Sequence, residues 1–341
     1  MEMSPTIARL VSGVCLLALA ACGGGGGGTT LTPPTTTTTT TTTTNTSSGP
    51  VNIGAPGAAT SGGSTLSFNL TNSLPPVGTI LPLRGPVVLA SPSAVSFPAI
   101  NDATATFRGT VVSGGTTYPV FDLNIPSLSV FAANVRGDGT SVTLSNGGQA
   151  SAIVASLNYL LLGAWSYTPP GNSGGYIGQT VTGSLSPASG VPSSGTATYT
   201  GSGSAGGVVG AFSVPSGSGT IQAGSLTGNV SLNVNFGSNT VTGTLSGMNA
   251  NTTANGSGTT PWNNVSLNGN LSRSSTVSMA GATSTTGAPA GAGTPGFSSA
   301  ATGAFSAQFY GPSGQEVGGS WTLYESTPAG GKTAVGTFAG R

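Results

Sequence analysis

Residues 230–247 read VSLNVNFGSNTVTGTLSG and carry the strongest structural signal in the chain. Apolar residues occupy every second position from Val230 to Phe236, and small polar residues fill the positions between them. After Gly237-Ser238-Asn239 the alternation returns from Val241 to Gly247. Because side chains alternate between the two faces of a strand, this pattern predicts a β-hairpin with one apolar and one polar face.

The same alternation recurs along most of the chain and predicts an all-β protein. Between residues 159 and 340 it predicts about eight antiparallel strands, enough to close a small up-and-down barrel filled with side chains. A porin-like barrel would need longer strands and two aromatic girdles, which 11 Phe, 7 Tyr and 3 Trp do not supply. The expected strands are Tyr159–Tyr167, Thr196–Gly201, Leu226–Phe236, Asn239–Met248, Asn264–Ser272, Thr276–Gly281, Thr302–Tyr310 and Val317–Tyr324, with Ala334–Gly340 extending or closing the sheet.

The N-terminus has the pattern of a bacterial lipoprotein signal. Arg9 precedes a short apolar run, and Leu19-Ala20-Ala21-Cys22 brings small residues up to a cysteine. We therefore expect residues 1–21 to be a signal peptide and Cys22 to carry the lipid, although an ordinary secretory signal with a chance cysteine would look similar. Residues 22–50, rich in Gly, Thr and Pro, are expected to be a disordered linker between the membrane and a folded body.

Composition narrows the possible functions. Charged residues make up 4% of the chain and the net charge is +1, a balance that argues against nucleic-acid binding. The chain has no histidine, so it lacks an imidazole base and the usual metal triads, and we expect neither catalysis nor a metal or other cofactor. Cys15 leaves with the signal peptide and Cys22 is used by the lipid, which leaves no cysteine for a disulfide.

Two motifs resemble a known family. Residues 195–201 read GTATYTG, and residues 309–321 read FYGPSGQEVGGSW. Together with the C-terminal GTFAG they are similar to the barrel of the transferrin-binding-protein-B-like surface lipoproteins. The motif positions, to which we assign structural roles, are Gly195, Ala197, Tyr199, Gly201, Phe309, Gly311, Pro312, Gly314, Glu316, Gly318, Gly319 and Trp321.

The resemblance implies an architecture and a function. Residues 51–157 would form a β-rich handle domain and residues 158–341 an eight-stranded barrel. The protein would lie in the outer membrane, facing the cell exterior, and would bind a host protein or an iron or haem source for presentation to an outer-membrane transporter or translocation channel. The chain has one handle and one barrel, whereas transferrin binders carry two such lobes. A structural or adhesive envelope lipoprotein without a specific soluble ligand is the alternative.

Few side chains suggest a ligand site. The expected loops at 201–210, 251–260 and 280–296 are mostly Gly, Ser, Thr and Ala, whereas tight protein recognition usually needs aromatic or arginine anchors. Trp262 follows Pro261 in an expected loop and is the best candidate for an exposed anchor. Glu316 follows a tight turn, where it could bind a ligand, pair with a backbone donor or fix the hairpin. We expect Glu325 and Lys332 to be solvated, and Trp165 and Trp321 to pack inside the barrel.

Overall fold

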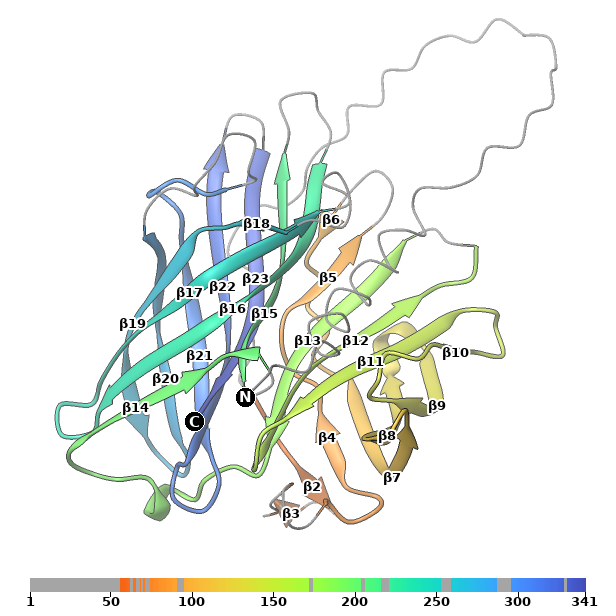
Figure 1. Cartoon of the computed structure of the whole chain (residues 1–341), viewed down its shortest axis with the longest axis horizontal. Coiled ribbons are helices and arrows are strands. Elements are labelled where there is room, and N and C mark those ends of the chain that lie inside the picture. The colour runs from red at the N-terminus through yellow and green to blue at the C-terminus, as the bar shows by residue number, and fades with distance from the viewer. Residues whose placement is uncertain are drawn as a thin grey trace, which may run out of the picture.

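The computed structural model describes residues 56–341 apart from 62–63, 66–67, 69, 71–73, 91–94, 172–173, 204–205, 216–220, 253–258, 287–295 and 328–329. The expected signal peptide, Cys22 and the linker lie outside the described residues. In the described part nearly every element is a strand, and the strands form two bodies that lie side by side (Figure 1). The all-β prediction is therefore confirmed. No described helix has the length and apolar character needed to cross a membrane.

The first body, which we call the handle, packs two sheets face to face. Residues that alternate along the strands of both sheets, such as Leu81, Phe121, Leu123 and Trp165, fill the space between them. One sheet has the order β10-β11-β12-β13-β5-β6, with β1 parallel to β13, and the other has the order β3-β2-β4-β7-β8-β9. The strands are β1 (Gly57–Ala58), β2 (Thr60–Ser61), β3 (Ser64–Thr65), β4 (Ile80–Pro82), β5 (Val87–Ala90), β6 (Val95–Ser96), β7 (Thr104–Ser113), β8 (Thr116–Ile125), β9 (Val130–Arg136), β10 (Val142–Thr143), β11 (Gln149–Ser156), β12 (Leu160–Thr168) and β13 (Gly175–Gly183), with a short 3-10 helix at Pro126–Leu128.

The second body is the predicted barrel. Within the described residues, pairing runs β16-β15-β23-β22-β21-β20-β19-β17, and β17 pairs back with β16, so eight antiparallel strands close the ring. Two short strands extend members of this ring: β14 continues the line of β15 along β16, and β18 continues the line of β19 along β17. The strands are β14 (Thr196–Gly201), β15 (Gly207–Pro215), β16 (Ile221–Asn235), β17 (Thr240–Thr252), β18 (Thr259–Pro261), β19 (Asn264–Arg273), β20 (Val277–Thr286), β21 (Thr302–Tyr310), β22 (Glu316–Thr327) and β23 (Gly330–Gly340); a 3-10 helix spans Ala188–Gly190.

The hairpin predicted from residues 230–247 is confirmed. Asn235 pairs with Thr240 across the turn, and Asn239 adopts a left-handed backbone with φ of 55°. The apolar positions of both strands point into the barrel, where Leu232, Val241 and Leu245 are fully buried among aromatic side chains from β21 to β23. A side-chain-filled barrel follows directly from the period of two in the sequence.

The boundary between the two bodies differs from the expected one at residues 157–158. Strands β12 and β13 pair with handle strands, so the segment expected as the first barrel strand belongs to the handle. The alternation predicted a strand there correctly, but β12 is buried on both faces, and local pattern cannot tell which sheet such a strand joins. Trp165 on this strand consequently packs in the handle core, whereas Trp321 lies in the barrel as expected.

The place of that missing strand in the barrel is taken by β15, part of which we expected to be a loop at 201–210. Glycines made the segment look like a loop, yet they allow backbones to approach closely. A Cβ atom at Gly210 would lie 2.8 Å from the carbonyl oxygen of Val335 on the neighbouring β23, which is closer than real Cβ contacts allow. The glycine is therefore required by the packing of the barrel wall.

Candidate functional site at the handle junction and the barrel mouth

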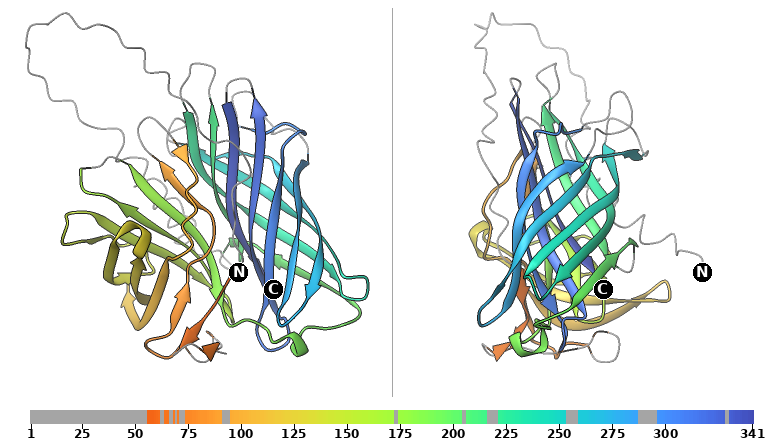
Figure 2. Two further views of the ribbon diagram at one scale, coloured as in Figure 1. Left: turned by 180° about the vertical axis from the view of Figure 1, so that it is seen from behind. Right: turned by 90° about the vertical axis from the view of Figure 1, so that its left-hand side faces the viewer.

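The handle and the barrel share a buried junction. Strands β12, β13 and β5 of the handle lie against the outer face of β15, β22 and β23 (Figures 1 and 2). Leu160, Val181 and Ala339 meet in one apolar cluster, and Val88 and Val335 meet in another. The two bodies therefore share apolar packing, and burial of this surface favours their association.

Glu316 lies at the centre of this junction. Its side chain is 0% exposed, and its carboxylate accepts backbone hydrogen bonds from three consecutive residues of the handle: Asn158 (2.6 Å), Tyr159 (2.8 Å) and Leu160 (3.1 Å). Burial raises the pKa of Glu316, while these three N–H groups and the charge of Arg341 oppose that shift. Of the three roles considered for Glu316, pairing with backbone donors is the one that the structure shows, and both carboxylate oxygens are used by the handle.

Other residues of the second motif, residues 309–321, also contribute to the junction between handle and barrel. Gly311 and Gly314 have φ values of 84° and 72°, which shape the turn before Glu316. Ser186, just after the last handle strand, donates its hydroxyl to the carbonyl oxygen of Gly311 and its backbone N–H to Phe309. A Cβ atom at Gly318 would lie 2.4 Å from Val181 of the handle. The turn and the glycines therefore serve the close contact between the bodies.

Residues 195–201, the first of the two motifs, contact the turn at residues 311–315 from the barrel side. Gly195 has a φ of 82°, and β14 follows directly with Ala197 and Tyr199 directed toward the barrel core. The hydroxyl of Tyr199 donates to the carbonyl oxygen of Gly314 at 2.7 Å, and its ring packs edge-on against Phe309. Burial raises the pKa of Tyr199 to about 12, so it remains a donor at physiological pH. The two motifs, separated in sequence, thus form one structural unit.

Trp262 is buried in the barrel, and its predicted exposure is wrong. Its side chain is 4% exposed and contacts the rings of Phe212, Phe297 and Trp321. Phe297 belongs to residues 296–301, a segment that we call the mouth cap because it lies at the end of the barrel where β15, β17, β20 and β22 terminate. An aromatic side chain in this sequence context is therefore a core residue rather than an exposed anchor.

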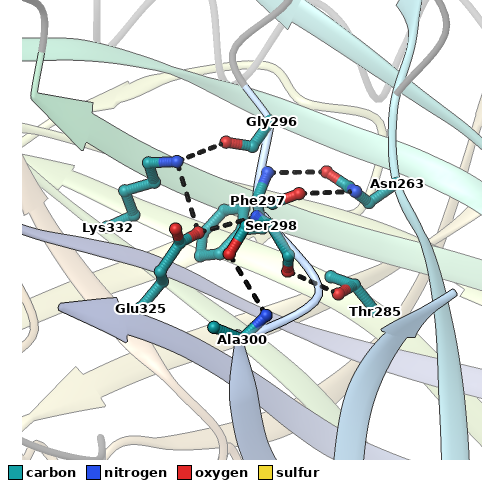
Figure 3. Close-up of polar contacts among 8 residues, drawn as sticks. All are labelled: Asn263, Thr285, Gly296, Phe297, Ser298, Ala300, Glu325 and Lys332. Atoms are coloured by element: carbon teal, nitrogen blue, oxygen red, sulfur yellow. Dashed lines mark hydrogen bonds and ion pairs between the residues drawn. The ribbon is translucent and has the colours of Figure 1, made fainter. Parts of the chain in front are cut away.

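Polar contacts hold the mouth cap in place (Figure 3). Asn263 both donates to and accepts from the backbone of Phe297, at 3.0 Å and 2.7 Å. The hydroxyl of Thr285 donates to the carbonyl oxygen of Ser298 at 2.6 Å. These bonds fasten the cap to β19 and β20 and place the Phe297 ring over the barrel core.

Glu325 and Lys332, which we expected to be solvated, instead anchor the cap from β22 and β23. Lys332 forms an ion pair with Glu325 at 3.2 Å, donates to the carbonyl oxygen of Gly296 at 2.9 Å and lies 5.9 Å from the centre of the Phe297 ring. The backbone N–H of Ser298 donates to Glu325 at 2.8 Å. Burial pushes the pKa of Glu325 upward, but the hydrogen bonds from Ser298 and the ammonium of Lys332 bring it below its ordinary value.

Clusters of possible metal ligands, cavities and exposed apolar side chains are the remaining features that could mark a site. Among the described residues, no three His, Cys, Asp or Glu side chains gather closely enough to hold a metal ion. An apolar cavity between the handle sheets, lined by residues such as Leu123, Leu161 and Trp165, measures about 30 Å³, room for no more than a few waters. The most exposed large apolar side chains of the described residues all belong to the handle: Leu74, Val77, Ile80, Val112 and Phe131.

Comparison with known proteins shows what the barrel is similar to. Residues 191–341 match the family model described as C-lobe and N-lobe beta barrels of Tf-binding protein B. This part of the chain is therefore similar to the barrels of Tf-binding protein B, and the resemblance seen in its motifs is confirmed. The match begins after the last handle strand, in agreement with the sheet pairing.

Solved structures of transferrin binding protein B are similar to this chain at low identity. A variant from Haemophilus parasuis Hp5 is 15% identical, with a TM-score of 0.41, over 79% of this chain and 46% of that chain. Intact Ap-TbpB, with N and C lobes, is 14% identical, with a TM-score of 0.41, over 79% and 48%. The isotype 1 protein from serogroup B Neisseria meningitidis is 13% identical, with a TM-score of 0.40, over 71% and 52%. This chain spans about half the length of these structures, and a search of curated proteins found no match.

Proposed function

We propose that this chain is an outer-membrane lipoprotein, anchored by Cys22 and facing the cell exterior, that captures a host protein carrying iron or haem and presents it to an outer-membrane transporter or translocation channel. The observation that carries the proposal is the match of residues 191–341 to barrels of Tf-binding protein B. The lipoprotein signal pattern at residues 1–22 supports the location.

The handle is the better candidate for the protein-binding surface. Phe131 is 61% exposed on β9 and Val112 is 69% exposed on β7 of the same sheet, and aromatic side chains such as Phe131 are enriched in protein interfaces. In contrast, Trp262 and Phe297 fill the barrel mouth, which favours an external protein partner over haem held inside the barrel. The neutral composition predicts that binding persists at high salt.

The test is capture from serum by the mature chain carrying Cys22→Ser. We expect a saturable serum protein to be retained in high salt, and we expect Phe131→Asp or Val112→Asp to weaken its retention at least tenfold, about 1.4 kcal/mol. Thr276→Asp, at an exposed position in the turn between β19 and β20 of the barrel, is the matched control and should retain the parent affinity. Absence of any saturable serum partner, or equal loss in the control, would overturn the proposal. A haem titration by absorbance tests direct haem binding, which we expect to be absent.

A further inference from the structure

The barrel wall formed by β14, β16, β17 and β19 presents a regular grid of neutral polar side chains. Strands β16 and β17 cross the front of the barrel in Figure 1, on the wall that continues through β14 and β19. No charged residue occurs between Asp138 and Arg273, and Arg273, the last residue of β19, is the one charged residue of the four strands; its guanidinium donates to Asn239 and Pro192 at the edge of the wall. The outward positions are Thr196, Thr198, Thr200, Ser231, Asn233, Asn235, Thr240, Thr242, Thr244, Ser266, Asn268 and Asn270; the two serines are half-buried and the others are exposed.

Strand register arranges these side chains in rows. In the central row Thr198 pairs with Asn233, Asn233 with Thr242, and Thr242 with Asn268, so threonine and asparagine alternate across four strands. The row at 196, 235, 240 and 270 repeats the alternation, and the row at 200, 231, 244 and 266 alternates threonine with serine. Neighbouring strands lie about 4.8 Å apart and successive outward residues about 6.8 Å apart, which spaces the groups at regular intervals.

Much of this hydrogen-bonding capacity faces solvent. Thr198 donates to Asn233 at 2.7 Å within the central row. Asn235 and Thr240 serve the adjoining turn through Gly237 and Ser238. Exposed Thr242, Thr244 and Asn268 present hydroxyl and amide groups that can both donate and accept.

The neutral polar character of the grid indicates which kinds of molecule could bind to it. The twelve outward positions carry no charge; Arg273, at the end of β19, and Arg341, which pairs with the backbone of Thr200, lie at the edge of the grid. The face of the grid itself therefore offers no ion pairs to nucleic acid or anionic lipid. Its twelve outward positions also include no aromatic or arginine side chain of the kind that dominates protein–protein contacts, and they form no apolar patch for a membrane. A partner that matches a repeating array of neutral donors and acceptors must itself be neutral, repetitive and rich in hydroxyl groups.

We propose that this wall binds neutral polysaccharide chains. The site is distinct from the handle surface of the proposed function. Ala223, near the start of β16, packs against the cluster that contains Val88 of the handle, whereas the grid positions of β16 lie further along the strand, from Ser231 to Asn235. Single hydroxyl contacts are weak, but many copies of the protein on one membrane would engage a polysaccharide at many points at once. The lipid-anchored protein would thereby adhere to a glycan-covered surface independently of its protein partner.

The experiment measures retention of the mature chain, carrying Cys22→Ser, on microcrystalline cellulose and on unmodified agarose beads, at low and high salt. We expect salt-independent retention on at least one of them. The combined change Thr242→Ala, Thr244→Ala and Asn268→Ala should reduce retention about tenfold or more, because three solvent-facing groups are removed together. Thr110→Ala, Thr116→Ala and Thr117→Ala, which removes three exposed hydroxyls from the handle, is the matched control and should behave as the parent.

Circular dichroism and thermal unfolding of both triple variants check that the fold is unchanged. Failure of the parent to bind either polysaccharide, or equal retention of the wall variant and the parent, would overturn the proposal. Sedimentation equilibrium tests whether the wall instead binds a second copy of this chain. If the parent is a dimer, does not bind polysaccharide, and becomes a monomer in the triple wall variant, the wall is a dimer interface. Serum capture by the wall variant should stay intact, which keeps this test separate from that of the proposed function.

Discussion

At the scale of single residues, the sequence predicted that Glu316 matters but did not identify its partners. Its motif and the preceding turn identified it as an unusual carboxylate, and pairing with backbone donors was one of the roles considered. Its donors, the N–H groups of Asn158, Tyr159 and Leu160, come from a part of the chain about 157 positions away. Backbone amides carry no residue signature, so only the tertiary structure could identify them as the partners.

Replacing Glu316 should weaken the whole fold. In Glu316→Ala three N–H groups in the junction lose their acceptor, and we expect the free energy of unfolding to fall by about 3 kcal/mol. Denaturant unfolding followed by circular dichroism measures this loss. Ser272→Ala, at an exposed position at the end of β19, is the control and should change stability by less than about 0.5 kcal/mol. A loss for Glu316→Ala no larger than that of the control would contradict the role assigned here.

Glu316 and Glu325 should give pH dependences of opposite sign. The pKa of Glu316 is raised in the folded state, so its contribution is fully present below the unfolded value of about 4.3 and is lost as pH rises through the folded pKa. The pKa of Glu325 is lowered, so its contribution is present above about 4.3 and is lost as pH falls through the folded pKa.

The measurement is the unfolding free energy of the parent, Glu316→Gln and Glu325→Gln across the acid range. The parent should exceed Glu316→Gln most at acidic pH, and the difference should shrink toward neutral pH. The parent should exceed Glu325→Gln by about 1 kcal/mol at neutral pH, and that difference should vanish on acidification. Parallel curves for the two variants would show that the burial and hydrogen bonds described here do not control these carboxyl groups.

At the scale of elements, the strands themselves were largely predictable and their partners were not. The hairpin of β16 and β17, and the strands β19 to β23, follow from alternating apolar residues. Strand β15 was missed because glycine, which local rules associate with loops, is needed here for the close approach of the neighbouring strand β23. Trp262 was misjudged because a residue after proline between two strands looks exposed, while the mouth cap that covers it comes from β20–β21.

Removal of Phe297 should open the barrel mouth. The Phe297→Ala variant loses a buried ring that contacts Trp262 and lies beneath Lys332, and we expect stability to fall by about 3 kcal/mol. Because Trp262 then meets water, its fluorescence should shift to longer wavelength and become accessible to acrylamide. Phe131→Ala, at an exposed site in the handle, should leave both signals unchanged. An unshifted spectrum in Phe297→Ala would show that residues 296–301 do not cover the barrel core.

At the scale of the whole molecule, two bodies are joined by a junction that combines apolar clusters with polar contacts. Gln179 of β13, with its amide oriented to satisfy its neighbours, donates to the carbonyl oxygen of Val209 and accepts from the N–H of Ala211 on β15. Tyr310 and Glu316, at the turn between β21 and β22, complete the contact with Leu160. Because these contacts join the two bodies, the exposed residues of the handle keep a fixed position relative to the barrel.

The prediction for the whole molecule concerns its attachment to the membrane through Cys22. Cells fed labelled palmitate should incorporate it into the parent chain and not into Cys22→Ser, because the thiol of Cys22 is the expected acceptor of the lipid. The parent should also sediment with outer membranes, while the variant should appear in the soluble fraction. Equal labelling of parent and variant would remove the basis for placing this protein on the cell surface.

The sequence by itself determined that the chain is built from strands, which residues face the barrel interior, and which family the barrel resembles, because a period of two and local motifs are written in consecutive residues. Only the tertiary structure decided that β12 and β13 belong to the handle, that Glu316 joins the two bodies, and that Glu325 and Lys332 fasten the mouth cap. Those outcomes depend on which distant segments come into contact, and contact is decided by packing and backbone hydrogen bonding across the fold rather than by local pattern.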